Sequence, residues 1–265
     1  MTDILDFTGK TAFIAGGSSG INLGIAQAFA QRGARVAIIS RSQERVDAAV
    51  AGIRASGGDA QGWSADVRDP EAVMAALSSA HAALGDFDVL VSGAAGNFLA
   101  SALGMSSNAF RTVVDIDLNG TFNVLRHAHP YLRKPGASVI NISAPQAVNP
   151  TPLQAHVCAA KAGVDMLTRV LAMEWGTDGI RVNAITPGPI ADTEGMRRMA
   201  PTDEAMAAVA RSVPLGRMGR LDEIANIALM LSSPLASFVT GAILPVDGGS
   251  SLGGARKLDA SWTQR

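Results

Sequence analysis

Cysteine, tyrosine and charged side chains are scarce in this sequence. Its 265 residues include one cysteine, Cys158, and one tyrosine, Tyr131, and only 17% are charged. A lone cysteine excludes an internal disulfide and fits a reducing compartment. Aromatic residues make up 5% of the chain, and no basic tract is interleaved with them. A nucleic-acid-binding role therefore has little support.

Long apolar runs are also missing. No apolar stretch reaches the 18 or so residues that suggest a membrane-spanning helix, and the first ten residues lack the basic and apolar regions of a secretory signal. We therefore expect a cytoplasmic protein without a membrane anchor. The composition, 48% hydrophobic with a net charge of −1, is that of a globular chain long enough to bury a large core.

Short apolar runs alternate with longer helical patterns. The runs cover residues 11–16, 35–40, 60–66, 87–93, 137–143, 180–186 and 242–248, and the main helical segments cover 20–32, 43–56, 70–84, 153–176 and 221–232. Runs that are apolar on both faces are typical of buried parallel strands. The alternation predicts an α/β fold: a doubly wound (Rossmann) parallel sheet of about seven strands with helices on both faces. We expect a single domain over 1–265, ending in a polar tail over 250–265.

The segment 153–176 has two apolar faces. One carries Val164, Leu167 and Leu171, and the other carries Met166, Val170 and Met173. A helix that is apolar on both sides is buried on both sides. We expect it to lie between the sheet and a second copy of the chain, in a homo-oligomer.

The first run is followed by a glycine-rich turn, "GGSSGI", before an apolar helix. In this context, backbone N–H groups and a helix N-terminus can bind a diphosphate. The candidate ligands are Gly16, Ser18, Ser19, Gly20 and Ile21. The alternative is an ordinary strand-to-helix turn.

The second run ends in "SRSQER", with Arg41 where enzymes that bind NAD tend to have an acidic residue. A guanidinium pairs instead with the 2′-phosphate of NADP(H), so we expect NADPH as the cofactor, unless Arg41 is only a solvated residue at a strand end. After the third run, Asp66 and Val67 are candidates for contact with the adenine.

Taken together, these stretches resemble the short-chain dehydrogenase/reductase family over nearly the whole chain. The resemblance rests on "GGSSGI", "ADV" at 65, "SGAAGN" at 92, "DIDLNG" at 115, "NIS" at 141, Lys161, "IRVNAITPGPI" at 180 and "VDGGS" at 246. It implies that Lys161 binds the nicotinamide ribose and that Thr193 helps to hold the diphosphate. It also implies a tetramer and adds five further cofactor-site residues, namely Gly93, Ala94, Pro187, Gly188 and Ile190.

The departures from the family pattern concern its catalytic positions. The asparagine, serine and tyrosine positions hold Asp117, Ala144 and Val157, and only Lys161 is retained. Asn22 replaces the third glycine of the turn, which puts close helix–strand packing there in doubt. Carbonyl reduction needs an acid to protonate the forming alkoxide, so these changes argue against an alcohol dehydrogenase. We expect Tyr131 at a helix end, away from this face.

One branch of the family lacks that tyrosine. "GAAGNF" at 93, "LQAHVCAAKAGVDMLTR" at 153 and "PGPIADTEGMRR" at 187 resemble the 2,4-dienoyl-CoA reductases, and the peroxisomal form in particular. The resemblance implies that Asn97 donates to the thioester oxygen, Asp117 holds a water that supplies the proton, and Lys161 pairs with Asp117. No metal is expected.

Other interpretations remain open at this stage. Asn97 is otherwise a turn residue, and Asp117 is otherwise a carboxylate satisfied by Lys161 alone. His156 is interpreted as a polar rim residue, or else as a proton shuttle. For the chain as a whole we expect an NADPH-dependent reductase of a 2,4-dienoyl-CoA. The alternatives are a non-catalytic NADP(H)-binding protein and a reductase of another acyl-CoA or carbonyl substrate.

Overall fold

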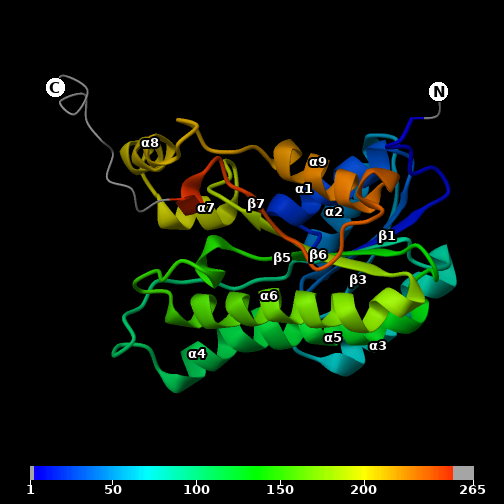
Figure 1. Cartoon of the computed structure of the whole chain (residues 1–265), viewed down its shortest axis with the longest axis horizontal. Coiled ribbons are helices and arrows are strands. Elements are labelled where there is room, and N and C mark those ends of the chain that lie inside the picture. The colour runs from blue at the N-terminus through cyan, green and yellow to red at the C-terminus, as the bar shows by residue number, and fades with distance from the viewer. Residues whose placement is uncertain (1–2, 253–265) are drawn as a thin grey trace.

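The computed structural model describes residues 3–252 and contains one parallel sheet of seven strands in the order β3-β2-β1-β4-β5-β6-β7 (Figure 1). The strands are β1 (Thr11–Ala15), β2 (Arg35–Ser40), β3 (Asp59–Ser64), β4 (Val89–Ser92), β5 (Ser138–Ile142), β6 (Arg181–Pro187) and β7 (Ile243–Val246). Each lies within two residues of a predicted run at both ends. The predicted α/β sheet is thus confirmed.

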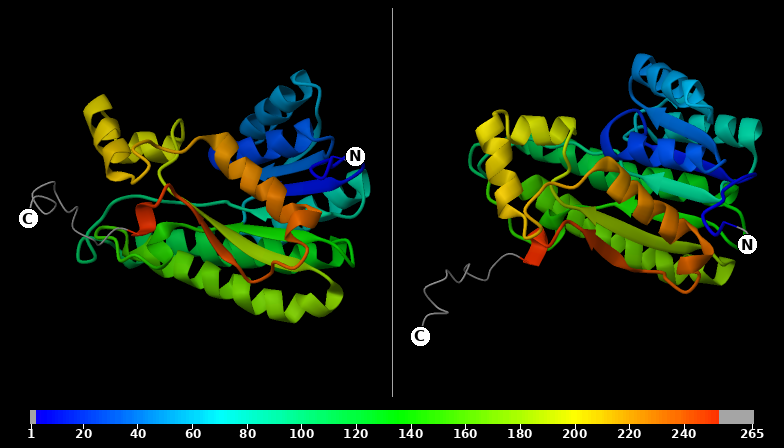
Figure 2. Two further views of the ribbon diagram at one scale, coloured as in Figure 1. Left: turned by 45° about the horizontal axis from the view of Figure 1, so that its top comes forward. Right: turned by 90° about the horizontal axis from the view of Figure 1, so that it is seen from above.

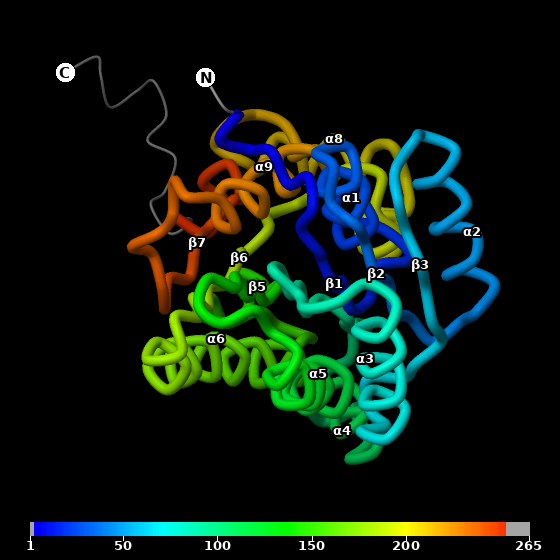
Figure 3. Tube along the Cα trace, turned by 90° about the vertical axis from the view of Figure 1, so that its right-hand side faces the viewer, coloured from blue at the N-terminus to red at the C-terminus, as the bar shows by residue number. Residues whose placement is uncertain are grey.

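Helices cover both faces of the sheet, as Figure 3 shows in an end-on view. One layer holds α1 (Gly20–Gln31), α2 (Gln43–Ala55) and α9 (Leu221–Ser232), and the other holds α3 (Pro70–Leu84), α4 (Ser107–Val114), α5 (Gly120–Ala128) and α6 (Ala155–Trp175). Two short helices, α7 (Glu194–Met199) and α8 (Asp203–Ser212), stand apart from these layers, beyond the end of β6 (Figure 2). No helix within residues 3–252 is long and apolar enough to cross a membrane.

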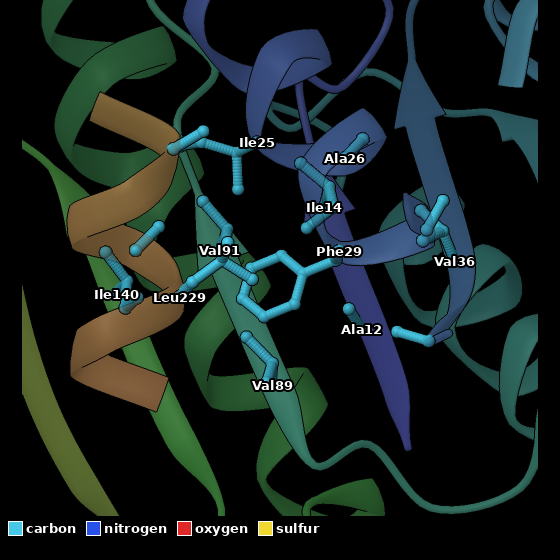
Figure 4. Close-up of a cluster of buried hydrophobic side chains, with 14 of the residues drawn as sticks. Ala12, Ile14, Ile25, Ala26, Phe29, Val36, Val89, Val91, Ile140 and Leu229 are labelled. Carbon is cyan, nitrogen blue, oxygen red and sulfur yellow. The ribbon is translucent and has the colours of Figure 1, made fainter. Parts of the chain in front are cut away.

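Alternate residues of each central strand pack into opposite layers. In β1, Ala12 and Ile14 join a cluster with Phe29 of α1, whereas Phe13 and Ala15 join the cluster on the other face. Figure 4 shows the first cluster, with Phe29 lying between the sheet and Leu229 of α9. All five residues of β1 are buried, which explains why the strand is a continuous apolar run rather than an alternating one.

A π-helical turn, Asp115–Asn119, joins α4 to α5. Such turns are rare and occur often at functional sites. The periodicity of the sequence does not predict this one, and it carries Asp117. Most of the predicted polar tail, residues 253–265, lies outside the described part of the chain.

Candidate active site

The predicted site residues follow the carboxyl ends of successive strands. The strand order reverses between β1 and β4, and the crevice outside such a switch point is where doubly wound sheets bind ligands. Two adjoining cavities, of about 980 and 630 Å³, lie there. Their walls include Gly16, Ser18, Ser19, Gly20, Ile21, Arg41, Asp66, Val67, Gly93, Ala94, Asn97 and Thr193.

The turn after β1 has the geometry of an anion cradle. Gly16 and Gly20 have φ values of +79° and +55°, which glycine adopts readily and most other residues do not. The N-cap residue of α1, Ser19, makes no side-chain cap hydrogen bond, and the first turn of α1 contains no acidic residue. The free N–H groups of this helix end are therefore available to a diphosphate, and the cradle fits a dinucleotide.

Asn22 packs closely despite replacing a glycine. Its Nδ2 donates to the carbonyl oxygen of Gly93 at 2.7 Å, and its side chain fills the space that a Cβ at Gly93 would occupy. Glycine at 93 thus makes room for the side chain at 22. The doubt about close packing at this position was wrong.

The smaller cavity is lined by three arginines and two acidic residues. Arg41, Arg45 and Arg198 line it together with Asp66 and Glu194, and Glu194 pairs with both Arg45 and Arg198. Hydrogen bonds from Arg68 hold the pKa of Asp66 below its ordinary value. Arg45 was missed in the sequence analysis. This residue follows Arg41 by four positions and lies in the first turn of α2, and that spacing could have indicated it.

A buried ion pair lies behind the wall of the larger cavity. Lys161 Nζ is 3.4 Å from Asp117 Oδ2, and the two side chains are 5% and 1% exposed. Lys161 also donates to the Ile142 carbonyl at 2.9 Å, and Asp117 Oδ1 accepts from the Gly96 N–H at 2.7 Å. Since Ile142 and Gly96 both line the larger cavity, the pair is held directly behind its surface. Asp117 Oδ2 accepts no hydrogen bond from residues 3–252.

Val157 occupies the turn of α6 before Lys161 and is 4% exposed. The only tyrosine of the chain is far from this position. Tyr131 ends a short 3₁₀ helix, and its carbonyl accepts from the N–H of Phe87, just before β4 begins. It therefore lies at the amino edge of the sheet, opposite the cavities, and cannot take over the role of the missing residue.

Asn97 lines the larger cavity and is held from behind by a residue that sequence reasoning missed. Gln154, fully buried, donates from Nε2 to Asn97 Oδ1 at 2.9 Å. The other end of the Asn97 amide, Nδ2, has one hydrogen-bond partner within residues 3–252, the sulfur of Met199 at 3.9 Å.

The interpretation of His156 as a polar rim residue is wrong. It is fully buried, its ring packs edge-on against Phe98 with a centroid separation of 4.3 Å, and its Nδ1 accepts from the Val157 N–H at 2.9 Å. Helix geometry places His156 about 140° from Lys161 around the helix axis, and this side was expected to be exposed. It is covered instead, because the loop carrying Phe98 packs against this side of the helix N-terminus.

The segment after β6 divides between the cavities and the core. Thr193 lines the larger cavity and caps α7 by accepting from the Met196 N–H at 3.2 Å. Three predicted cofactor-site residues of this segment line neither of the two cavities, namely Pro187, Gly188 and Ile190. Ile190 is 3% exposed and lines a different cavity, whose wall includes Pro245 and Val246 of β7. The predicted contact of all three with the nicotinamide stays a prediction.

Comparison with known proteins identifies the family. A family profile described as "Enoyl-(Acyl carrier protein) reductase" matches residues 15–251. The chain is 47% identical to the peroxisomal 2,4-dienoyl-CoA reductase [(3E)-enoyl-CoA-producing] of Rattus norvegicus, over 91% of this chain and 83% of the relative. The chain belongs to the short-chain dehydrogenase/reductase family.

Other relatives agree with this assignment. A probable 2,4-dienoyl-CoA reductase [(2E)-enoyl-CoA-producing] of Bacillus subtilis is 38% identical over 92% of this chain and 97% of the relative. A crystal structure of a dehydrogenase/reductase from Sinorhizobium meliloti superposes with a TM-score of 0.86 at 35% identity, covering 93% of this chain and 98% of that one. The chain is therefore an oxidoreductase, and the family uses a nicotinamide cofactor.

Proposed function

We propose that this oxidoreductase uses NADPH to reduce a conjugated 2,4-dienoyl-CoA thioester to an enoyl-CoA. The observation that carries the proposal is the pairing of Asp117 with Lys161 behind the cavity wall that includes Asn97, while apolar Val157 stands at the family's tyrosine position. A site with these residues suits a reaction in which a carbon atom is protonated and no alkoxide has to be protonated.

Asn97 is proposed to bind the thioester oxygen. When bound, NADPH supplies a hydride to the far carbon of the diene, and negative charge then collects on the thioester oxygen as a dienolate. The Asn97 Nδ2 donor, which lines the cavity with no oxygen partner among the described residues, stabilises this charge without transferring a proton.

Asp117 is proposed to hold the water that protonates the α-carbon. Its Oδ2 faces the Lys161 ammonium at 3.4 Å and accepts no hydrogen bond from residues 3–252, so it has the capacity to accept one from a water. Lys161 holds the carboxylate in place, and the charge of each side chain is balanced by the other. Protonation at the α-carbon leaves the double bond between the third and fourth carbons.

Arg41 supports the choice of NADPH, since it lines the smaller cavity and a guanidinium group matches the 2′-phosphate. Arg45 and Arg198 line the same cavity but are paired with Glu194. A cytoplasmic homotetramer remains part of the proposal. The rat relative is named as peroxisomal, and cell fractionation decides the location of this protein.

The experiment supplies NADPH with 2,4-hexadienoyl-CoA or with simple ketones and follows NADPH absorbance. We expect turnover with the dienoyl-CoA only. In D₂O, NMR of the product should show deuterium on the α-carbon. Turnover with ketones alone would contradict the proposal, and tight NADPH binding without any turnover would indicate a non-catalytic binding protein.

A further inference from the structure

The loop that carries Asn97 is attached to the start of α6 at three points. Gln154 Nε2 donates to Asn97 Oδ1 at 2.9 Å, the Ala100 N–H donates to the Leu153 carbonyl at 3.0 Å, and the Phe98 ring packs on the His156 ring. Residues 97–100 are therefore held by the turn that leads into α6, and Gln154 is the only one of these contacts that reaches the Asn97 amide.

The backbone before Gln154 is strained in a way that aims this side chain inward. Leu153 has φ +67° although it is not glycine, and its side chain is 48% exposed while Gln154 is fully buried. A branched residue in the left-handed region is uncommon and persists only where the surroundings require it. Here the unusual turn places a buried amide behind Asn97.

The amides form a chain with a direction. Gln146 Nε2 donates to Gln154 Oε1 at 3.1 Å, and Gln154 Nε2 donates to Asn97 Oδ1. With its oxygen occupied from behind, the Asn97 amide presents its N–H₂ to the cavity. The reversed chain would turn the Asn97 oxygen to the cavity, where it would repel a developing oxyanion.

We infer that Gln154 is a positioning residue for the reaction, which orients the Asn97 amide so that a donor faces the thioester oxygen. This inference rests on the proposed role of Asn97. Gln154 itself touches neither cavity and acts only through Asn97. An Asn97 N–H₂ group that faces the cavity favours substrates in which an oxygen accepts a hydrogen bond and becomes negatively charged during the reaction.

The test combines Gln154→Glu and Gln154→Met with Asn97→Ala. An ionised glutamate of the same shape accepts only, whereas a protonated one could still donate to Asn97. At alkaline pH the variant should therefore turn the Asn97 amide around and lower kcat for 2,4-hexadienoyl-CoA nearly as far as Asn97→Ala does, by about 10²-fold, the size of losing one oxyanion donor. Gln154→Met leaves the amide free to rotate and should cause a smaller loss. In each double variant kcat should equal that of Asn97→Ala alone, because the two residues act as one unit.

NADPH affinity serves as a control for both variants, since a merely structural role would move it together with kcat. The thermal midpoint serves as a control for Gln154→Met only, because a buried carboxylate lowers it by itself. Gln154→Glu with a kcat within about twofold of the wild type even at alkaline pH, or losses that multiply with that of Asn97→Ala, would overturn the inference. If the wild type does not reduce the dienoyl-CoA, the proposed function fails independently. A neutron crystal structure then decides the inference: an Asn97 N–D₂ group facing the cavity supports it, and an oxygen there refutes it.

Discussion

Asp117 and Lys161 form a buried ion pair, 3.4 Å between Oδ2 and Nζ, that joins the π-helical turn Asp115–Asn119 to α6. The two residues are 44 positions apart in the sequence. The pair leaves Asp117 Oδ2 as an acceptor without a hydrogen-bond donor among residues 3–252, and the proposed proton donor depends on that atom.

Replacing Asp117 by asparagine should abolish the hold on the proton-donating water. We expect turnover of 2,4-hexadienoyl-CoA to fall by about 10²–10⁴-fold, the usual contribution of a positioned proton-transfer group. NADPH affinity should change much less. Asp165→Asn is a matched control, because it also removes a buried carboxylate one turn from Lys161 but lies outside the proposed mechanism. Normal turnover by Asp117→Asn would show that the proton comes from elsewhere.

Restoring the family's tyrosine should not help this enzyme. Val157 is 4% exposed, so Val157→Tyr adds a ring to a packed position, at a cost of about 1–3 kcal/mol in stability. We expect lower dienoyl-CoA turnover. Val157→Phe separates bulk from chemistry, because it adds the ring without the hydroxyl. A tyrosine variant that is much more active than the phenylalanine variant would mean that an acid at 157 had been missing.

Arg41→Ala should weaken NADPH binding selectively. Losing a hydrogen bond to a charged group costs about 1.5–3 kcal/mol, which corresponds to about 10- to 150-fold in Kd. NADH lacks the 2′-phosphate and is the internal control. Fluorescence titration of both cofactors checks this, and an equal loss for the two would show that Arg41 does not bind the phosphate.

Asp165→Asn should raise stability at neutral pH. Burial raises the pKa of Asp165 in the folded protein, although Ser143 and the charges of Arg169 and Lys161 act in the opposite direction. Between the ordinary value near 3.8 and the higher folded value, the folded protein binds more protons than the unfolded chain, so the wild type loses stability as pH rises. Thermal midpoints measured from acid to neutral pH should diverge progressively in favour of the variant. A difference in thermal midpoint that stays constant with pH would contradict the raised pKa of Asp165.

The exposed face of α6 should mediate assembly. Met166, Val170 and Met173 are 56%, 40% and 83% exposed and lie on one side of the helix at spacings of four and three residues. Val170→Glu and Met173→Glu should each shift the particle mass in light scattering from about four times 27.2 kDa toward that of one chain. A wild-type particle of one chain mass at micromolar concentration would refute the oligomer.

Local sequence determined the fold and much of the cofactor site. Continuous apolar runs are imposed by burial on both faces of a sheet, and parallel strands place their carboxyl ends at one edge, so Gly16, Arg41 and Asp66 could be assigned to one crevice from their positions after successive strands. The Asp117–Lys161 pair was anticipated only from resemblance to a family.

Tertiary structure alone decided the contacts that depend on two distant segments meeting. Asn22 fits because Gly93 leaves space for it, His156 is buried because the Phe98 loop covers it, and Gln154 reaches Asn97 because Leu153 takes up a left-handed backbone conformation. None of these has a periodic signal, since a single side chain filling a gap or completing a hydrogen bond changes no pattern along the chain. Such contacts are set by the shape of the packed molecule.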